Sequence, residues 1–530
     1  MSARFRPIPG PVPTGGPAPE ALPRAQWQQL LAFALLYVLV WSVLPPRLLS
    51  SLPFDVVESI SWGREWQWGY YKHPPLAPWV LHLFYRAFGN VGPFLLSQLC
   101  IAATLGFVWL TGRRLLGPQR ALLGTALTMG VAFYTRPALE FNHNVAQMPL
   151  WAGIGWAMLV ALQEGRPRHW LLLGLLGGLG MLTKYSIGIL LLCLGLYLLL
   201  GPQRARLRGA GPWLALAVLL AVLAPHLKWL WQSGWLPLTY MGERSATPGS
   251  SARLAALGFL ATQLLNHLPM LLVLLGAALG ARRSLPAAGA ALTGGPRGYA
   301  LHTTWPGYLW CLALGPGLLL TLLGLALGLR IRDMWGMPMW AFSGLLVAAW
   351  LPGRWVAPLR TPVLRGTAAW LVLATALSLG YLAFGAQLRH KPARTDWPQA
   401  ALAAQAAATW DALSHCPLDV VAGNYWLAGL VAVPLAQRPS VLVTGDARFS
   451  PWVTPQRLLH GGALWLREDD EAPAPPAPLG DPTVLAALQE HRGQWQLPWP
   501  HDAQAPALTL HWRAYVPARC SRAAPAPSNF

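Results

Sequence analysis

The amino-acid sequence predicts a polytopic α-helical membrane protein with a small C-terminal α/β domain. The 530 residues are 54% hydrophobic and only 11% charged, whereas soluble domains have about 25% charged residues. Apolar runs close to the ~20 residues that cross a bilayer recur along the chain, as in TAAWLVLATALSLGYLAF (367–384). After residue 386 these runs stop, and strand-like stretches alternate with helix-like ones, as in small α/β domains.

The net charge of +20 does not indicate a nucleic-acid-binding protein. From residue 387 onward, 11 Lys and Arg residues are balanced by 11 Asp and Glu residues, so the basic excess belongs to the membrane part. Many of these basic residues lie in short loops, which is the topology signal of membrane proteins rather than a patch for polyanions. We therefore expect a lipid bilayer as partner and no nucleic acid.

Three parts are expected along the chain. Residues 1–27 are Pro- and Gly-rich and basic, and are predicted to be a disordered cytoplasmic arm. Residues 28–386 form the transmembrane part, whose first outer loop covers 51–92, and residues 387–530 form the soluble domain. About eleven transmembrane helices are expected, at 28–50, 93–111, 121–135, 146–163, 170–183, 186–200, 212–230, 256–281, 305–328, 338–352 and 367–386.

The distribution of charge predicts how the chain is oriented in the membrane. The loops on the side of the N-terminus hold 17 Lys and Arg residues, and the opposite short loops hold fewer, so the N-terminus is expected in the cytoplasm. An odd number of helices then puts the C-terminal domain outside. Most carboxylates of the membrane part fall on this outer side, which suggests a binding or active surface there: Asp55, Glu58, Glu65, Glu140, Glu243 and Asp333.

The C-terminal domain is expected to contain strands and short helices. PLDVVAGNYWLAGLVAVPLAQ (417–437) reads as a strand followed by a helix, and PTVLAALQEHRG (482–493) reads as a short helix. Two further strands are expected at 439–446 and 463–468. Cys416 and Cys520 are expected to form a disulfide, because cysteines in even number on an oxidising side of the membrane are usually paired. No CxxC motif or His/Cys cluster indicates a structural zinc site.

The first outer loop contains the stretch DVVESISWGREWQWGYYKHPPLAPW (55–79), which joins carboxylates to cations. Residues 55–68 can form an amphipathic helix on the membrane surface, with Asp55 and Glu58 on one face and tryptophans in the interfacial zone. The other end of the stretch offers Lys72 and His73. A carboxylate can take a proton from an acceptor, and a cation can neutralise a phosphate leaving group. An ordinary interfacial helix with solvated charges stays open as the alternative.

Six motifs follow one another along the chain. The first is the acidic pair Asp55 and Glu58 followed by GYYKHPPL (69–76). The others are FNHNVAQMPLW (141–151), GMLTKYS (180–186), PHLKWLWQSGWLPLTYMGERS (225–245), NYWLAGLVAV (424–433) and RPSVLVTGDARFSPW (438–452). In kind and in order these motifs resemble the polyprenyl-phosphate-dependent glycosyltransferases of the protein O-mannosyltransferase and lipid A aminoarabinose transferase superfamily (GT-C fold).

The resemblance implies roles for individual residues. Asp55 matches the catalytic base, and Glu58 is a second acidic candidate, although Val56 stands where many members have Glu. Lys184, in a break between two apolar runs, is a candidate for contact with the donor phosphate, with plain snorkelling to the membrane surface as the alternative. The further candidates for binding phosphate or sugar are Lys72, His73, Arg136, Asn142, Asn144 and Arg244. A helix N-cap is an alternative use of the asparagines.

The resemblance implies an inverting glycosyltransferase in the bacterial inner membrane. It would move a sugar from an outer-leaflet polyprenyl-phosphate carrier to an extracytoplasmic lipid, glycan or protein, with Asp55 as base. Some members have an acid where this chain has Lys72, which argues against a metal bound by this loop. A divalent metal cofactor is otherwise left open. Two alternatives remain: a transporter or flippase of glycolipids without covalent chemistry, and a family member that binds glycolipid without turnover. No internal repeat supports a transporter, and the acids gather at one surface.

Overall fold

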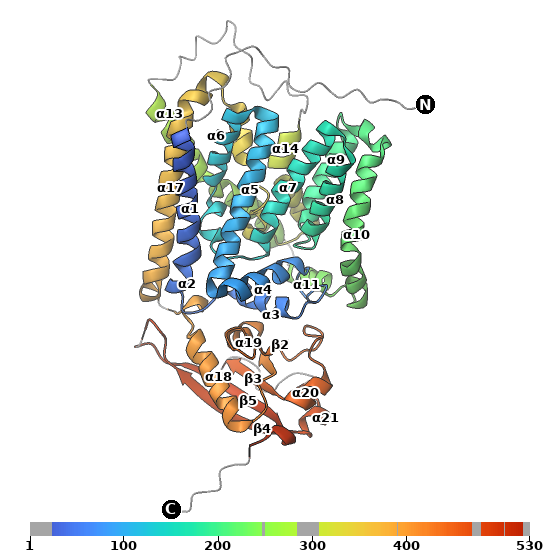
Figure 1. Cartoon of the computed structure of the whole chain (residues 1–530), viewed down its shortest axis with the longest axis vertical. Coiled ribbons are helices and arrows are strands. Elements are labelled where there is room, and N and C mark those ends of the chain that lie inside the picture. The colour runs from blue at the N-terminus through green and yellow to red at the C-terminus, as the bar shows by residue number, and fades with distance from the viewer. Residues whose placement is uncertain are drawn as a thin grey trace, which may run out of the picture. The chain divides into compact units, whose positions relative to one another are not determined.

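A computed structural model of the chain describes residues 24–245, 250–282, 307–389, 391–468, 479–502 and 504–522 (Figure 1). The chain divides into two compact units. Unit 1 comprises Met1–Trp41, Lys72–Leu76 and Leu95–Ser378, and unit 2 comprises Ser42–Tyr71, Ala77–Phe94 and Leu379–Phe530. The division runs through the first outer loop, so most of that loop belongs to the same unit as the C-terminal domain.

Unit 1 is built from apolar helices. Its helices in the described ranges are α1 (Arg24–Val43), α5 (Gly92–Leu116), α6 (Pro118–Met129), α7 (His143–Glu164), α8 (Pro167–Met181), α9 (Ile187–Leu200), α10 (Ala210–Gln232), α11 (Leu236–Ser245), α12 (Ser250–Asn266), α13 (Leu268–Ala281), α14 (Tyr308–Ala313), α15 (Gly315–Leu327), α16 (Ser343–Trp350) and α17 (Gly353–Leu388). The last residues of α1 and α17 and the first residues of α5 belong to unit 2.

Small residues let these helices approach one another closely. Helix α8 packs between α7 and α10 (Figure 1). A Cβ atom at Gly174 of α8 would lie 2.3 Å from the carbonyl oxygen of Ala215 in α10. In the same way, a Cβ at Gly344 of α16 would lie 2.2 Å from the carbonyl oxygen of Gly124 in α6. Small residues at helix contacts are typical of membrane proteins, where close van der Waals packing drives helix association.

Within the described ranges, six helical segments are long and apolar enough to cross a membrane: Arg24–Leu48, Leu76–Leu116, His143–Glu164, Ala210–Gln232, Arg253–Ala281 and Gly353–Leu388. Two shorter apolar helices, Ile187–Leu200 and Gly315–Leu327, accompany them. Helices α9 and α10 lie close to their expected positions, whereas α17 begins at Gly353, 14 residues before the expected span at 367–386. The expected span at 121–135 is instead the 12-residue α6 followed by two 3-10 turns, Ala132–Tyr134 and Arg136–Ala138. The total of about eleven spans stays a prediction.

Unit 2 contains short helices around a five-stranded sheet. Its helices in the described ranges are α2 (Pro45–Leu48), α3 (Phe54–Arg64), α4 (Leu76–Phe88, of which Leu76 belongs to unit 1), α18 (Gln399–Leu413), α19 (Tyr425–Ala432), α20 (Pro455–Gly461) and α21 (Pro482–Leu485). The strands are β1 (Val420–Gly423), β2 (Ser440–Val443), β3 (Ala463–Glu468), β4 (Leu488–Leu497) and β5 (Leu508–Pro517).

The sheet has the strand order β2-β1-β3-β5-β4. Strand β1 pairs in parallel with β2 and β3, and β3, β5 and β4 pair antiparallel, with Leu464 opposite Ala514. All four residues of β1 and of β2 are buried, as is typical of parallel strands covered on both faces. Helix α19 packs on β1 and β2, and α18 packs on α19. The apolar core gathers Leu442, Leu458, Trp465, Leu479, Val484 and Tyr515 with their neighbours.

The structure contains the small α/β domain that the sequence predicts, and corrects one element of it. The stretch 482–493, expected to be a helix, is helical only over Pro482–Leu485, and from Leu488 it is the edge strand β4. Cys416 and Cys520 form the expected disulfide, with Cα atoms 5.3 Å apart. Ser414, two residues before Cys416, forms a β-bridge with Ser521, which follows Cys520. The disulfide and the bridge together tie the end of α18 to the C-terminal end of the sheet.

Candidate active site

Helix α3 in unit 2 carries the two acidic candidates of the first outer loop. Asp55 lies half-buried in the first turn of the helix, where a negative charge interacts favourably with the helix dipole. Glu58 is one turn further on and only 5% exposed. Its Oε1 accepts a hydrogen bond of 3.3 Å from the hydroxyl of Tyr71. The two carboxylates therefore share one face of a single helix, as their spacing predicts.

The expected amphipathic helix over 55–68 is shorter and more buried than predicted. Helix α3 ends at Arg64, and Trp66 has the left-handed φ of +47°. Trp62, expected in the membrane interface, is buried and stacks on Tyr70 with ring centroids 5.2 Å apart. Trp66 and Trp68 are exposed. The prediction is wrong for Trp62 because Tyr70 comes back over the helix after the turn and covers it.

Gly63 fixes how α3 packs on α4. A Cβ atom there would lie 2.1 Å from the carbonyl oxygen of Pro78 and 2.6 Å from Cβ of His82. We expect Gly63→Ala to push the two helices apart and to cost about 1–3 kcal/mol of stability, as overpacking does. Gly106→Ala is the matched control, because nothing lies within 4 Å of a Cβ at that helical position. Thermal unfolding of the full chain in detergent should show a lower midpoint for Gly63→Ala alone.

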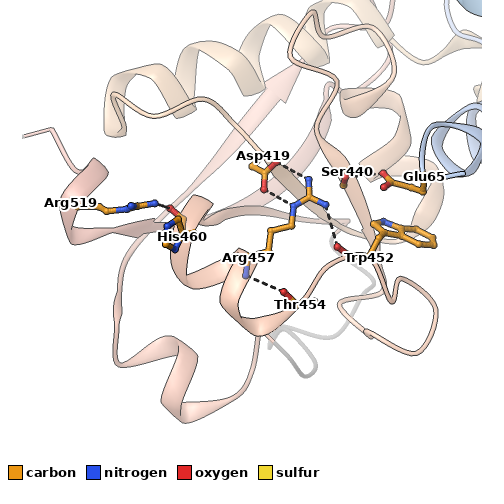
Figure 2. Close-up of polar contacts among 8 residues, drawn as sticks. All are labelled: Glu65, Asp419, Ser440, Trp452, Thr454, Arg457, His460 and Arg519. Carbon is orange, nitrogen blue, oxygen red and sulfur yellow. Dashed lines mark hydrogen bonds and ion pairs between the residues drawn. The ribbon is translucent and has the colours of Figure 1, made fainter. Parts of the chain in front are cut away.

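Glu65, the third carboxylate of the loop, has a structural environment. Its Oε1 accepts a hydrogen bond of 2.8 Å from the hydroxyl of Ser440 at the start of β2 (Figure 2). Beside it, Asp419 holds the guanidinium of Arg457 through two bonds of 2.7 Å, as Figure 2 shows. Burial raises the pKa of Glu65, although Ser440 and Arg64 oppose the shift. We therefore assign Glu65 to the packing of the loop on the sheet and not to catalysis.

The raised pKa of Glu65 predicts how stability depends on pH. A carboxyl group whose pKa is raised in the folded state stabilises that state fully below its unfolded pKa of about 4.3, and this contribution is lost as the pH rises through the folded pKa. Glutamine stays neutral at every pH, so Glu65→Gln avoids the stability that the parent loses when Glu65 ionises. We therefore expect the unfolding midpoint of Glu65→Gln to exceed that of the parent at about pH 8 but not at about pH 4.5.

Asp446→Asn is the control of opposite sign for Glu65→Gln. The hydrogen bond from Arg448 lowers the pKa of Asp446, so that carboxylate stabilises the fold at neutral pH and this contribution is lost as the pH falls. Asp446→Asn should therefore lower the midpoint near pH 8. A lowered midpoint for Glu65→Gln at the same pH would contradict the burial argument.

A second polar cluster, in unit 1, contains Lys72, His73, His143, Asn144 and Lys184. The imidazoles of His73 and His143 stack with centroids 3.9 Å apart. The ammonium of Lys184 donates to Oδ1 of Asn144, and the ammonium of Lys72 lies 5.7 Å from the centroid of the Tyr240 ring. The cluster thus joins residues from three separate stretches of the sequence, around 72, 143 and 184.

The backbone explains why these residues meet. The two prolines after His73 prevent a helix there, and the N–H of Leu76 donates to the carbonyl oxygen of Leu182 at 2.9 Å. Lys184 lies in the break between α8 and α9, as the sequence predicts. Asn142 has the alternative role of helix N-cap, because its Oδ1 accepts from the N–H groups of Asn144 and Val145.

Polar burial and positive charge define the chemistry of this cluster. His143 and Asn144 are about 5% exposed or less, and uncompensated polar groups in such places cost several kcal/mol. Burial, together with the charges of His143, Lys184 and Lys72, lowers the pKa of His73 well below its usual range. His73 is therefore neutral at physiological pH, while the two lysines keep the cluster cationic. A partly buried cationic cluster of this kind favours an anionic group such as a phosphate.

Two further candidates, Arg136 and Arg244, have different surroundings. Arg136 begins the 3-10 turn Arg136–Ala138 and is half-buried. Arg244 falls in the last turn of α11, but its side chain lies outside the described residues. Within the described ranges no group of three or more His, Cys, Asp or Glu residues is placed to hold a metal ion, so we assign no residue to a metal.

The structure adds polar partners that the sequence analysis missed. Gln147 is fully buried, and its Oε1 accepts a hydrogen bond of 2.7 Å from the hydroxyl of Ser186. Tyr185 and His226 are joined by a hydrogen bond of 3.1 Å between the hydroxyl and Nε2. The sequence could have indicated Gln147 as a member of the polar cluster, because it lies three residues after Asn144 and hence on the same helix face.

The chain is similar to known glycosyltransferases. Residues 72–229 match the family model of dolichyl-phosphate-mannose-protein mannosyltransferase (PMT_2). Among solved structures, the chain resembles the crystal structure of ArnT from Cupriavidus metallidurans in the apo state, with a TM-score of 0.55 and 14% sequence identity. The match covers 92% of this chain and 98% of that chain. A sequence comparison with curated proteins gives no match. The family match contains all five residues of the cationic cluster, Lys72, His73, His143, Asn144 and Lys184.

Proposed function

We propose that this chain, a multi-pass membrane protein with the GT-C fold and a mannosyltransferase-family segment, is an inverting glycosyltransferase. It would transfer a sugar from an outer-leaflet polyprenyl-phosphate carrier to an extracytoplasmic acceptor. The observation that carries the proposal is the cationic cluster of Lys72 and Lys184 around His73, His143 and Asn144, which lies inside the matched family segment. That cluster is the part of the molecule suited to a lipid-linked phosphate.

The cluster would stabilise the leaving group. In the reaction, the bond between the anomeric carbon and the phosphate oxygen breaks, and its electron pair stays on the phosphate. The ammonium groups of Lys184 and Lys72 would neutralise the negative charge that develops on the phosphate. Fixed cations stabilise such a developing charge strongly in a site of low dielectric. Asn144, which accepts from Lys184, would position that ammonium. His73 is neutral, so the two lysines would be the cations of the cluster that contact the phosphate.

Asp55 would serve as the base. The acceptor forms its new bond to the anomeric carbon from the face opposite the phosphate, and its proton passes to the carboxylate of Asp55. Glu58 lies on the same face of α3 and accepts a hydrogen bond from Tyr71. We therefore propose that Glu58 holds this face of α3 in position. One loop, 51–92, carries both Asp55 and Lys72, which supports their use in one reaction.

The disulfide between Cys416 and Cys520 supports the proposed orientation. Disulfides persist in the periplasm and outside the cell and are rare in the cytosol. The C-terminal domain, which holds this bond, would therefore be extracytoplasmic. We accordingly propose the bacterial inner membrane as the location, with the N-terminus in the cytoplasm.

The proposal is tested by turnover of defined donors. The purified full chain in detergent would be incubated with synthetic polyprenyl-phosphate sugars and with lipid, glycan and peptide acceptors. We expect release of polyprenyl phosphate to accompany glycosylation of one acceptor class. If no donor is cleaved with any acceptor while the donors still bind, the protein carries glycolipid without covalent chemistry, and the transferase proposal fails.

A further inference from the structure

Unit 2 contains a narrow cavity that neither the base nor the cationic cluster of unit 1 uses. It lies between α3, α4 and the segment that joins α19 to β2, and its volume of about 20 Å³ is enough for one water-sized group. The walls bring together three basic side chains, Arg64, His82 and Arg438, with Ser61 and Tyr85. None of the described residues that line this cavity is acidic.

Two of the basic side chains that line the cavity contain buried polar atoms that the protein does not satisfy. Among the described residues, neither Nη1 of Arg64 nor Nδ1 of His82 has a hydrogen-bond partner, although both atoms are buried. The whole side chain of His82 is buried. Buried polar atoms in proteins are nearly always hydrogen-bonded. Two unsatisfied nitrogen atoms on side chains of one cavity therefore indicate that a ligand with acceptor oxygens completes it.

The neighbouring carboxylates leave an excess of positive charge around the cavity. The charges of Glu65 and Asp419 act on Arg64, but both carboxylates are bonded elsewhere, as Figure 2 shows. Glu65 accepts a hydrogen bond from the start of β2, and Asp419 binds the guanidinium of Arg457 through both oxygens. Arg438 repels Arg64. An anion between these two guanidinium groups would remove the repulsion and gain charge-assisted hydrogen bonds.

A strained turn holds Arg438 at the cavity. The φ angle of Arg438 is +48°, in the left-handed region that residues other than glycine, asparagine and aspartate rarely adopt. Its N–H closes the turn by donating to the carbonyl oxygen of Leu435 at 2.9 Å. Backbone strain of this kind is found at ligand clamps, where the contacts of the side chain compensate for it. The turn thus places a cation beside another cation at a cost in backbone energy, which favours a binding role.

Exposed aromatic and apolar side chains adjoin the cavity. Trp66 is exposed, and its ring lies edge-on to the ring of His82 with centroids 6.4 Å apart. Leu83 and Phe88, on the same helix as His82, are also exposed. Tryptophans and helices with an apolar outer surface are typical of the membrane interface, the level at which lipid headgroups lie. A lipid phosphate therefore fits these surroundings better than a free anion does.

We propose that this cavity binds the headgroup phosphate of an anionic phospholipid, with one phosphate oxygen between Arg64, His82 and Arg438. The lipid is neither donor nor acceptor of the proposed reaction, and its binding does not depend on that reaction. Helix α3, which carries Asp55, ends at Arg64, so the bound lipid would hold this end of the helix at the membrane surface. A zwitterionic headgroup fits less well, because its own cation is repelled by the basic side chains.

Binding is measured without turnover, so the result does not depend on transferase activity. Dihexanoyl phosphatidylglycerol is titrated into the full chain in detergent, and the rise of the unfolding midpoint with lipid concentration gives the affinity. Dihexanoyl phosphatidylcholine and inorganic phosphate are the matched probes. We expect phosphatidylglycerol to bind at least about tenfold more tightly than either, which corresponds to about 1.4 kcal/mol. Equal affinity for phosphatidylglycerol and phosphate would indicate a site for free anions, and equal affinity for the two lipids would indicate apolar partitioning. Either result would overturn the proposal.

Three variants test whether the lipid binds in the cavity. Arg438→Asn should weaken the binding of phosphatidylglycerol at least about tenfold, because the charge is lost whereas asparagine tolerates the left-handed backbone. Arg492→Asn is the matched control, because Arg492 is exposed on β4 of the same unit and does not line the cavity. Arg64→Gln should cause a loss similar to that of Arg438→Asn, and it provides the test if Arg438→Asn does not fold. Unchanged binding in the folded cavity variant, or an equal loss in Arg492→Asn, would contradict the proposal.

Discussion

Asp55→Asn is expected to lower the transfer rate by about 10²–10⁴-fold, the usual contribution of a general base. Asparagine keeps the size of the side chain and tolerates the first turn of α3, so the helix should fold unchanged. The proton of the acceptor then has no carboxylate to receive it. The measurement is kcat with saturating donor and acceptor, together with an unfolding curve that shows the variant to be folded.

Two variants control the test of Asp55. Asp411→Asn changes an exposed aspartate of α18 in the same unit and should leave kcat unchanged. Glu58→Gln should have a smaller effect than Asp55→Asn, because the hydroxyl of Tyr71 can donate to the amide oxygen as it does to the carboxylate. Full activity in folded Asp55→Asn would remove Asp55 from the role of base.

Lys184→Met is expected to lower kcat by about 10²–10³-fold, the range found when one charge-stabilising group is removed. Methionine keeps the unbranched apolar stem but cannot neutralise the departing phosphate. Because the charge develops mainly as the bond breaks, kcat should fall more than the affinity for the donor. Lys184→Arg should restore part of the activity, since a guanidinium keeps the charge but has another shape.

Lys228→Met is the matched control for Lys184→Met. Lys228 lies on α10 in the same unit and is exposed, so its removal should change neither kcat nor KM. If Lys184→Met weakens donor binding and leaves kcat intact, then Lys184 anchors the ground state only. Unchanged kinetics in Lys184→Met would favour snorkelling of the lysine to the membrane surface and would separate the cluster from catalysis.

Much of the fold was predictable because apolar composition and helix breaks are local signals. The polar stretch between two apolar runs located the break at Lys184, and the buried strands β1 and β2 stood out as short apolar runs. Strand β4 was missed because PTVLAALQ has helix-forming residues, whereas the strand is stabilised by pairing with β5 far along the chain. The position of Lys184 could thus be predicted from neighbouring residues, whereas the pairing of β4 depends on residues far along the chain.

The candidate site was predictable in its residue types but not in its contacts. The hydrogen bond between Lys184 and Asn144 joins residues 40 positions apart, and the stacking of His73 on His143 depends on how the two prolines after His73 direct the chain. Trp62 was misassigned because its burial is caused by Tyr70 beyond the turn at Trp66. Such contacts depend on tertiary packing, which no spacing within one segment reveals.

We propose that this protein breaks the bond between a sugar and a lipid phosphate. The most direct measurement uses a polyprenyl-phosphate sugar labelled with ¹³C at the anomeric carbon, in proteoliposomes that contain the full chain and its acceptor. We predict one polyprenyl phosphate per sugar transferred, with inverted configuration at the labelled carbon, and formation of both products slowed at least about 100-fold with Asp55→Asn. A labelled donor that moves between the leaflets with its phosphate–sugar bond intact would contradict the account and show a transporter instead.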